Sequence, residues 1–111
     1  MKKIEAVIFP VFLNAVRIEL ERRSVRGGLT LVEVRYIESD KRLLATERAG
    51  SGNLQERVKL ELIVEDSEAE EVVNVILRHA QPQSDEDGGQ IVVLEVNENL
   101  RIGPAPGQVV L

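Results

Sequence analysis

Hydrophobic and polar residues alternate with a period of two in several stretches of the chain, which is typical of β-strands with one buried face. The stretches are residues 3–9, 29–36 and 57–64, and residues 91–96 are apolar throughout except for Glu95. Residues 91–96 do not alternate, so we expect this last strand to be covered on both faces. Residues 13–23 and 67–80 instead have apolar positions at helical spacing, so the predicted order is strand, helix, strand, strand, helix, strand.

Capping residues and prolines indicate where the helices begin and end. Asn14 is a candidate N-cap of the first helix, and Ser67 with Glu70 has the spacing of a capping box at the second. The second helix is expected to end near Ala80, because a proline follows two residues later. A short additional strand is expected at residues 100–102. The apolar face predicted for the second helix comprises Val72, Val73, Ile76, Leu77 and Ala80.

The element order βαββαβ predicts a ferredoxin-like α+β fold with a four-stranded antiparallel sheet. Right-handed crossovers place both helices on one face of that sheet and leave the other face bare. An apolar surface on the bare face favours burial in an oligomer. The apolar residues expected to form it include Val7, Phe9, Leu29, Leu31 and Ile63.

The 111 residues predict one domain, residues 1–111, in which one connection is unusually long. Residues 36–56 form a mixed-charge segment between two strand patterns, whereas hairpin connections usually have about 2 to 5 residues. A connection of this length favours a functional loop. Residues 81–90 form a second, polar loop, and residues 97–111 form a C-terminal tail rich in glycine and proline.

The amino-acid composition disfavours some classes of binding partner and some cellular compartments for this protein. Nineteen acidic and 14 basic residues give a net charge of −5, which disfavours nucleic acid and anionic membrane surfaces. Stacking aromatics for RNA are also scarce, since there are only two phenylalanines and one tyrosine. The absence of cysteine, of a signal peptide pattern and of a long apolar run is compatible with a soluble cytoplasmic protein.

Few residues suggest catalytic or metal chemistry. His79, near the end of a predicted helix, complements the helix dipole more readily than it ligates a metal. The acidic residues 85–87 lack the ligand spacing of a calcium loop and are expected to be solvated. We find no nucleophile elbow and no Walker loop, so no catalytic residue is assigned and an enzyme is not expected.

Two glycine pairs and two arginines are candidates for anion binding. Gly27–Gly28 and Gly88–Gly89 could admit a phosphate to the backbone, although such pairs more often form turns. Arg57, at the end of the long connection, and Arg101, in the tail, are the basic residues best placed for an anion. An ordinary surface charge is the alternative for both arginines.

Taken together, these stretches resemble the PII signalling superfamily over nearly the whole chain. The similarity is strongest in residues 1–20, which begin Met-Lys-Lys-Ile-Glu-Ala-Val-Ile. Gly28–Val34 resembles the family's Gly-x-Thr-x-x-Glu-Val strand, and residues 57–64 resemble its third strand. Residues 88–93 fall where the family has an Asp-Gly-Lys-Ile turn, and Arg101–Ile102 where it has Arg-Ile-Arg.

The resemblance implies a homotrimer that binds an adenine nucleotide, ADP, AMP or ATP, in the clefts between subunits. Residues 36–56 would correspond to the family's T-loop, which contacts target proteins such as a membrane transporter or an enzyme, and residues 81–90 to its B-loop. The resemblance places Gly28 and Thr30 by the adenine. By the phosphates it places Arg57, Gly88, Gly89 and Arg101.

The sequence also departs from the family pattern. Residues 36–40 replace a Gly-x-Gly-Arg-Gln motif, so the glutamine that helps hold magnesium and 2-oxoglutarate has no counterpart, and the tyrosine that accepts a nucleotidyl group is missing. Gln90 replaces the phosphate-loop lysine, and Gly103 replaces the second tail arginine. The carboxylates at 85–87 would further weaken triphosphate binding, because like charges repel by about 1 kcal/mol or more at close range.

These departures suggest a divergent PII-like protein rather than a nitrogen regulator of the usual type. Some PII-like proteins serve carbon or bicarbonate uptake, and that role suits the loss of the 2-oxoglutarate residues. The alternative is a structural or protein-interaction module of the same fold that has lost nucleotide binding.

Overall fold

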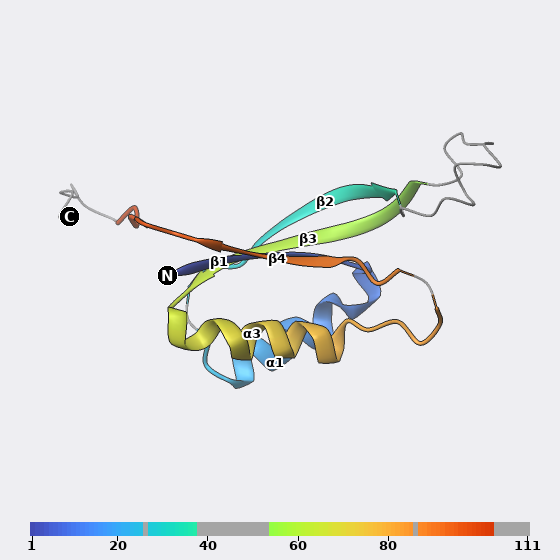
Figure 1. Cartoon of the computed structure of the whole chain (residues 1–111), viewed down its shortest axis with the longest axis horizontal. Coiled ribbons are helices and arrows are strands. Elements are labelled where there is room, and N and C mark those ends of the chain that lie inside the picture. Colours follow the sequence, from blue (N-terminus) through green and yellow to red (C-terminus); the bar gives the residue numbers. More distant parts are fainter. Residues whose placement is uncertain (26, 38–53, 86, 104–111) are drawn as a thin grey trace.

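The computed structural model describes residues 1–25, 27–37, 54–85 and 87–103. Within these residues a four-stranded antiparallel sheet, in the order β2-β3-β1-β4, has two α-helices on one of its faces (Figure 1). The predicted ferredoxin-like fold is therefore confirmed. The elements are β1 (Lys2–Ile8), a 3₁₀ turn (Pro10–Phe12), α1 (Leu13–Arg22), β2 (Thr30–Ile37), β3 (Leu54–Val64), α3 (Asp66–His79) and β4 (Gln90–Glu95).

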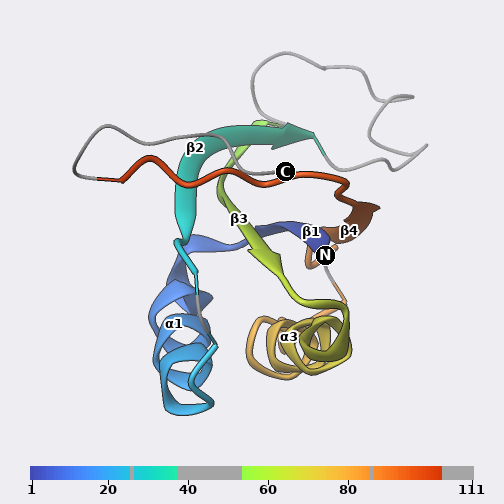
Figure 2. The same ribbon diagram turned by 90° about the vertical axis from the view of Figure 1, so that its left-hand side faces the viewer.

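The core lies between the two central strands and the helices, which run side by side below the sheet in Figure 2. Alternate residues of β1 and β3 point toward the helices, as the period of two predicts. Because few aromatics are available, aliphatic side chains fill this space. The most deeply buried of them are Ile4, Ala6, Val16, Leu60, Val72, Val75 and Ile76.

The helices begin at other residues than the capping pattern predicted. Asn14 is not an N-cap, because the 3₁₀ turn continues directly into α1 and the cap position is Phe12, which has no side-chain cap bond. The predicted pair Ser67–Glu70 is also wrong. Glu65 and Glu68 form the capping box of α3, since β3 ends at Val64 and the helix follows at once.

One face of α3 is buried, but it differs from the predicted stripe. Ala69 and Val75 are buried in addition to Val72 and Ile76, whereas Leu77 is 57% exposed. The helix ends at His79, close to the predicted end.

Two predictions, that the fourth strand is covered on both faces and that residues 100–102 form a strand, are wrong for the single chain. β4 is an edge strand, and Val92, Val93 and Leu94 are 37 to 47% exposed, so it is not covered on both faces. Residues 100–102 form no strand, because nothing in the described chain pairs with them there.

The bare face of the sheet is more polar than expected. Leu31 lies opposite Leu60 and therefore on the helix side, and Leu29 packs against the core. The centre of the bare face instead contains an ion-pair network. It joins Lys3 to Glu5 and Glu61, and Lys59 to Glu61.

The strands β2 and β3 extend into the segment that was predicted to be a loop. Tyr36 pairs with Gln55 and Ile37 with Leu54, so both ends of the segment 36–56 belong to a long two-stranded ladder. The remainder, residues 38–53, lies outside the described residues, as do residues 104–111 of the tail. A single domain over residues 1–111 stays a prediction.

Candidate functional site

The predicted ligand-binding residues form two groups at opposite ends of the sheet. The α3–β4 connection lies at the end where β2 finishes and β3 starts, and residues 99–103 lie at the other end (Figure 1). The first group is Gly28, Thr30 and Arg101, and the second is Arg57, Gly88 and Gly89.

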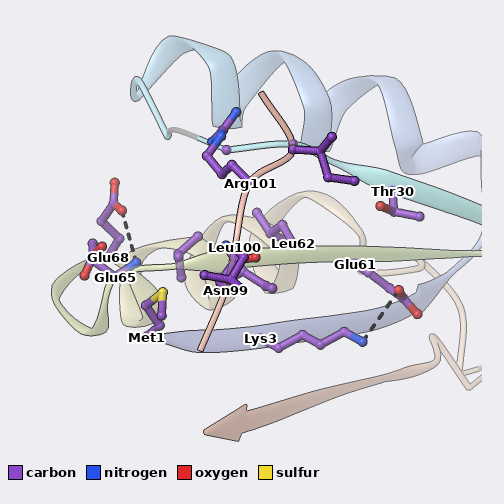
Figure 3. A pocket seen from close by; sticks show the side chains of 15 residues that line it. Met1, Lys3, Thr30, Glu61, Leu62, Glu65, Glu68, Asn99, Leu100 and Arg101 are labelled. Carbon is purple, nitrogen blue, oxygen red and sulfur yellow. Dashed lines mark hydrogen bonds and ion pairs between the residues drawn. The ribbon is translucent and has the colours of Figure 1, made fainter. Parts of the chain in front are cut away.

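The first group lines an open groove with a volume of about 1050 Å³. The start of β2, the second half of β3, the first turn of α3 and residues 99–102 form its walls (Figure 3). Thr30 and Arg101 are both exposed and contribute a hydroxyl and a guanidinium. Leu62 and Leu100 add apolar surface, and Glu61, Glu65 and Glu68 add carboxylates.

Gly28 leaves this groove open. No atom lies within 4 Å of the Cβ that an alanine would add there, and Gly28 is exposed. A ligand can therefore approach the backbone closely at this position, and a side chain would obstruct the ligand without disturbing the fold.

Glu61 supplies a carboxylate to the same groove and was missed by the sequence analysis. It lies opposite Thr30 in the β2–β3 ladder. A hydrogen bond from Lys59 (3.0 Å) and the nearby charge of Lys3 (3.7 Å) lower the pKa of this carboxyl from its usual 4.5. Glu61 is therefore ionised at neutral pH and can accept hydrogen bonds from a ligand.

The second group centres on Arg57, whose side chain is only 2% exposed. Its Nη2 donates to Gln55 Oε1 at 2.6 Å and to the carbonyl oxygen of Asp87 at 2.8 Å. The guanidinium also packs over the rings of Phe9 and Tyr36. Nε and Nη1 of Arg57 have no hydrogen-bond partner in the described part of the chain.

Asp87 connects the turn before β4 to the end of β2. Its Oδ1 accepts from the backbone N–H of Gly89 at 2.9 Å, and its Oδ2 accepts from the Tyr36 hydroxyl at 2.8 Å. Asp87 is half-buried, whereas Asp85 is exposed. The expectation of a solvated acidic loop is therefore wrong for Asp87, which tertiary hydrogen bonds hold in place.

Gly89 and Gly88 are confined by neighbouring backbone and ring atoms. Gly89 has φ +113°, and a Cβ there would lie 1.8 Å from the carbonyl oxygen of Val7. A Cβ on Gly88 would lie 2.8 Å from Cδ of Pro82. The tight turn explains this glycine pair without reference to a ligand, and the backbone N–H of Gly89 already donates to Asp87.

One chain does not bring the two groups together. Gly28 and Thr30 adjoin Glu61 of β3, while the other group adjoins Arg57, four residues earlier on the same strand. Four residues of extended chain span about 13 Å. The candidate residues therefore lie in two separate places on each chain, one beside Leu62, Leu100 and Arg101 and the other around Arg57 and the Gly88–Gly89 turn.

The side chains that surround Arg57 were not among the predicted site residues. Phe9 follows the first strand and Tyr36 ends the second, and each was counted only as a rare aromatic. Their joint position is encoded in the alternation, because Phe9, Arg57 and Tyr36 all belong to the bare face of the sheet. Asp87 could be recognised only once the turn before β4 was placed beside β2.

The described residues contain neither a cluster of metal ligands nor a membrane-spanning helix. No group of three or more histidine, cysteine, aspartate or glutamate side chains converges there in a way that could hold a metal ion. No helix among these residues is both long and apolar enough to cross a membrane.

The sequence model of the family described as "Nitrogen regulatory protein P-II" matches residues 1–105. Three relatives with that same description are similar over 104 residues, which is 92% of this chain and 91% of each relative. The relative from Porphyra purpurea is 30% identical, that from Microchaete diplosiphon 32%, and that from Pasteurella multocida 33%. The similarity spans every strand and helix described above.

Proposed function

The chain belongs to the P-II family of nitrogen regulatory proteins, and from that premise we propose that this signalling regulator binds an adenine nucleotide between two copies of itself. We also propose that nucleotide occupancy controls a partner protein through the connection between β2 and β3. The first proposal is supported by the positions of the predicted site residues, which lie in two groups at opposite ends of the sheet.

A second copy would complete each half-site. The groove with Gly28, Thr30 and Arg101 offers apolar surface for a purine and a cation for the first phosphate. The turn with Gly88 and Gly89 offers backbone N–H groups for phosphates further along the chain. Three copies around an axis, with each groove facing the next copy's turn, would form three such sites, in line with the family's homotrimer.

The residues proposed to lie near the phosphates favour a nucleotide that has few phosphate groups. Gln90 brings no positive charge to the start of β4, Gly103 brings none to the tail, and Asp87 adds a negative charge beside Gly89. We therefore expect ADP and AMP to bind better than ATP, since each added phosphate increases the repulsion.

The partner is proposed to contact residues 36–56. The paired ends of this segment, Tyr36–Ile37 and Leu54–Glu56, form a stem that begins next to Arg57 and Asp87. The hydrogen bond from Tyr36 to Asp87 therefore connects the proposed nucleotide half-site directly to the stem. A membrane transporter or a metabolic enzyme is the kind of partner that the family suggests.

We propose that this regulator serves carbon or bicarbonate metabolism rather than nitrogen metabolism. Residues 36–40 lack the family's Gly-x-Gly-Arg-Gln motif, and with it the glutamine for magnesium and 2-oxoglutarate. This proposal rests on the sequence departures, and it predicts that added 2-oxoglutarate leaves the nucleotide affinity unchanged.

A second candidate is a protein-interaction module that has lost nucleotide binding. Arg57 favours it, because the guanidinium is buried and already engaged by Gln55 and Asp87. The open groove around Gly28 and Arg101 favours the first proposal.

Calorimetric titration with AMP, ADP and ATP separates the two candidates. Saturable binding that the Arg101→Ala variant weakens would support the nucleotide sensor. The absence of both heat and a thermal shift at millimolar nucleotide would overturn it and leave the interaction module.

A further inference from the structure

The carboxylate of Asp87 accepts a hydrogen bond from the turn to which the proposed function assigns the phosphates. One oxygen accepts from the backbone N–H of Gly89 (2.9 Å), and the other accepts from the hydroxyl of Tyr36 (2.8 Å). The carbonyl oxygen of the same residue accepts from buried Arg57 (2.8 Å). The turn thus holds an anion of its own, fixed by contacts to three different parts of the chain.

An external phosphate needs the same donor that Asp87 uses. A backbone N–H donates one good hydrogen bond, so a phosphate oxygen at Gly89 must displace the Asp87 carboxylate or lie beside it. Displacement breaks the hydrogen bonds to Gly89 and Tyr36, and coexistence brings two like charges within a few ångströms. Both routes penalise the phosphate that reaches this turn.

The penalty depends on the number of phosphates. In the proposed arrangement the purine and the first phosphate lie in one copy's groove, near Arg101, and only the later phosphates extend to the Gly88–Gly89 turn of the next copy. We propose that Asp87 is an internal competing anion that sets the preference of this site for AMP over ATP. This inference rests on the proposed function and deepens it.

The same contact links the site to the stem of the long connection. Tyr36 is the penultimate residue of β2, and its hydroxyl is hydrogen-bonded to the group that a terminal phosphate displaces. A triphosphate that displaces the carboxylate therefore releases a tether on the stem, and a monophosphate leaves the tether in place. In this way the number of phosphates determines whether Tyr36, at the base of the long connection, stays bonded to Asp87.

The test compares Asp87→Asn and Asp87→Ala with the wild-type chain. The asparagine removes the charge and keeps the size and one acceptor oxygen, and the alanine removes the competing group entirely. Asp85→Ala is the matched control, because it removes an equal charge from the exposed part of the same loop. Circular dichroism and thermal unfolding establish that each variant is folded before titration.

Calorimetry with AMP, ADP and ATP gives the Kd ratio of ATP to AMP for each protein. We expect both Asp87 variants to lower this ratio by about tenfold, and Asp85→Ala to lower it by less than about threefold. An unchanged ratio in the Asp87 variants, or an equal change in Asp85→Ala, overturns the inference while leaving the proposed function intact. Failure of every protein to bind any nucleotide overturns the proposed function and the inference together.

Fluorescence supplies an independent measurement, because Tyr36 is the only tyrosine and tryptophan is absent. In the wild type, ATP should change the tyrosine emission more than AMP does. In Asp87→Ala, the emission should differ from wild type without nucleotide, and ATP and AMP should then have equal effects. Equal responses to ATP and AMP in the wild type would contradict the release of the tether.

Discussion

The guanidinium carbon of Arg57 lies 3.6 Å from the centre of the Phe9 ring, on the face of the sheet that has no helices. The ring of Tyr36 lies 4.5 Å from the same atom. A guanidinium shielded from water in this way gains about 2 kcal/mol from an aromatic ring. Arg57 therefore contributes to the stability of the strand ends as well as to the candidate site.

Replacement of Arg57 is expected to destabilise the protein. Arg57→Ala should lower the free energy of unfolding by about 2 to 4 kcal/mol, because it removes two hydrogen bonds and the packing on Phe9. Arg57→Met should cost about half as much, since it keeps the packing and removes the unpaired buried donors. Urea unfolding measures both changes. Exposed Arg35→Ala is the control, and equal stability of Arg57→Ala and this control would refute the structural role.

Two glycines should respond in opposite ways to alanine. Gly89→Ala should lower the unfolding free energy by several kcal/mol or prevent folding, because its Cβ would collide with the Val7 carbonyl. Gly28→Ala should leave the melting temperature unchanged, because the space around it is empty, and should weaken nucleotide binding. Thermal unfolding and calorimetry on the same samples separate the two effects. Unchanged nucleotide affinity in Gly28→Ala would remove the groove from the proposed site.

Mixed oligomers test whether the site is shared between copies. Arg101→Ala disables the groove, and Gln90→Glu adds a negative charge to the exposed start of β4, next to the Gly88–Gly89 turn. Each variant alone should bind nucleotide about tenfold more weakly. Refolded together, they should regain part of the sites with wild-type affinity, because some interfaces join an intact groove to an intact turn. No recovery in calorimetry of the mixture would contradict a shared site.

Acid should destabilise the protein through carboxylates that are paired in the native state. The hydrogen bond from Lys59 and the charge of Lys3 lower the pKa of Glu61, and the amino group of Met1 lowers that of Asp66. A lowered native pKa contributes stability above the usual value near 4.5 and loses it as the pH falls through the native pKa. The urea midpoint should therefore decline below about pH 5.

The Glu61→Gln variant should have a flatter decline in acid than the wild type, and 1 M salt should reduce the difference by screening. Glu98→Gln, in the exposed segment after β4, is the matched control. Identical acid profiles of the wild type and Glu61→Gln would exclude this carboxylate as a source of the pH dependence.

The oligomer predicted from the resemblance can be measured directly. Light scattering should give three times the chain mass of 12.4 kDa. Val92 lies on the bare face and is 37% exposed, so Val92→Glu should weaken assembly. Ile18→Glu, on the outer side of α1, should leave the mass unchanged. A monomeric wild type would contradict both the trimer and the shared nucleotide site.

The type and order of the elements can be read from the sequence, because three strands alternate, both helices have helical spacing, and the last strand is a short apolar run. The alternation of β1 and β3 specified which residues face the helices, and Pro82 marked the end of α3. Positions where several side chains compete for one role were less well determined. Glu65 caps α3 in place of Ser67, because the strand ends immediately before it and its carboxylate can also accept the free N–H groups.

The grouping of the candidate residues follows from the alignment of neighbouring strands and cannot be read from any one element. Cross-strand register places Thr30 with Glu61 and Tyr36 with Gln55, and so separates the groove from the surroundings of Arg57. The same register revealed an ion-pair network on the face that was expected to be apolar. Contacts such as that between Asp87 and Tyr36 join residues 51 positions apart. Local periodicity cannot predict such pairs, because it describes the faces of single elements and not the alignment of one element with another.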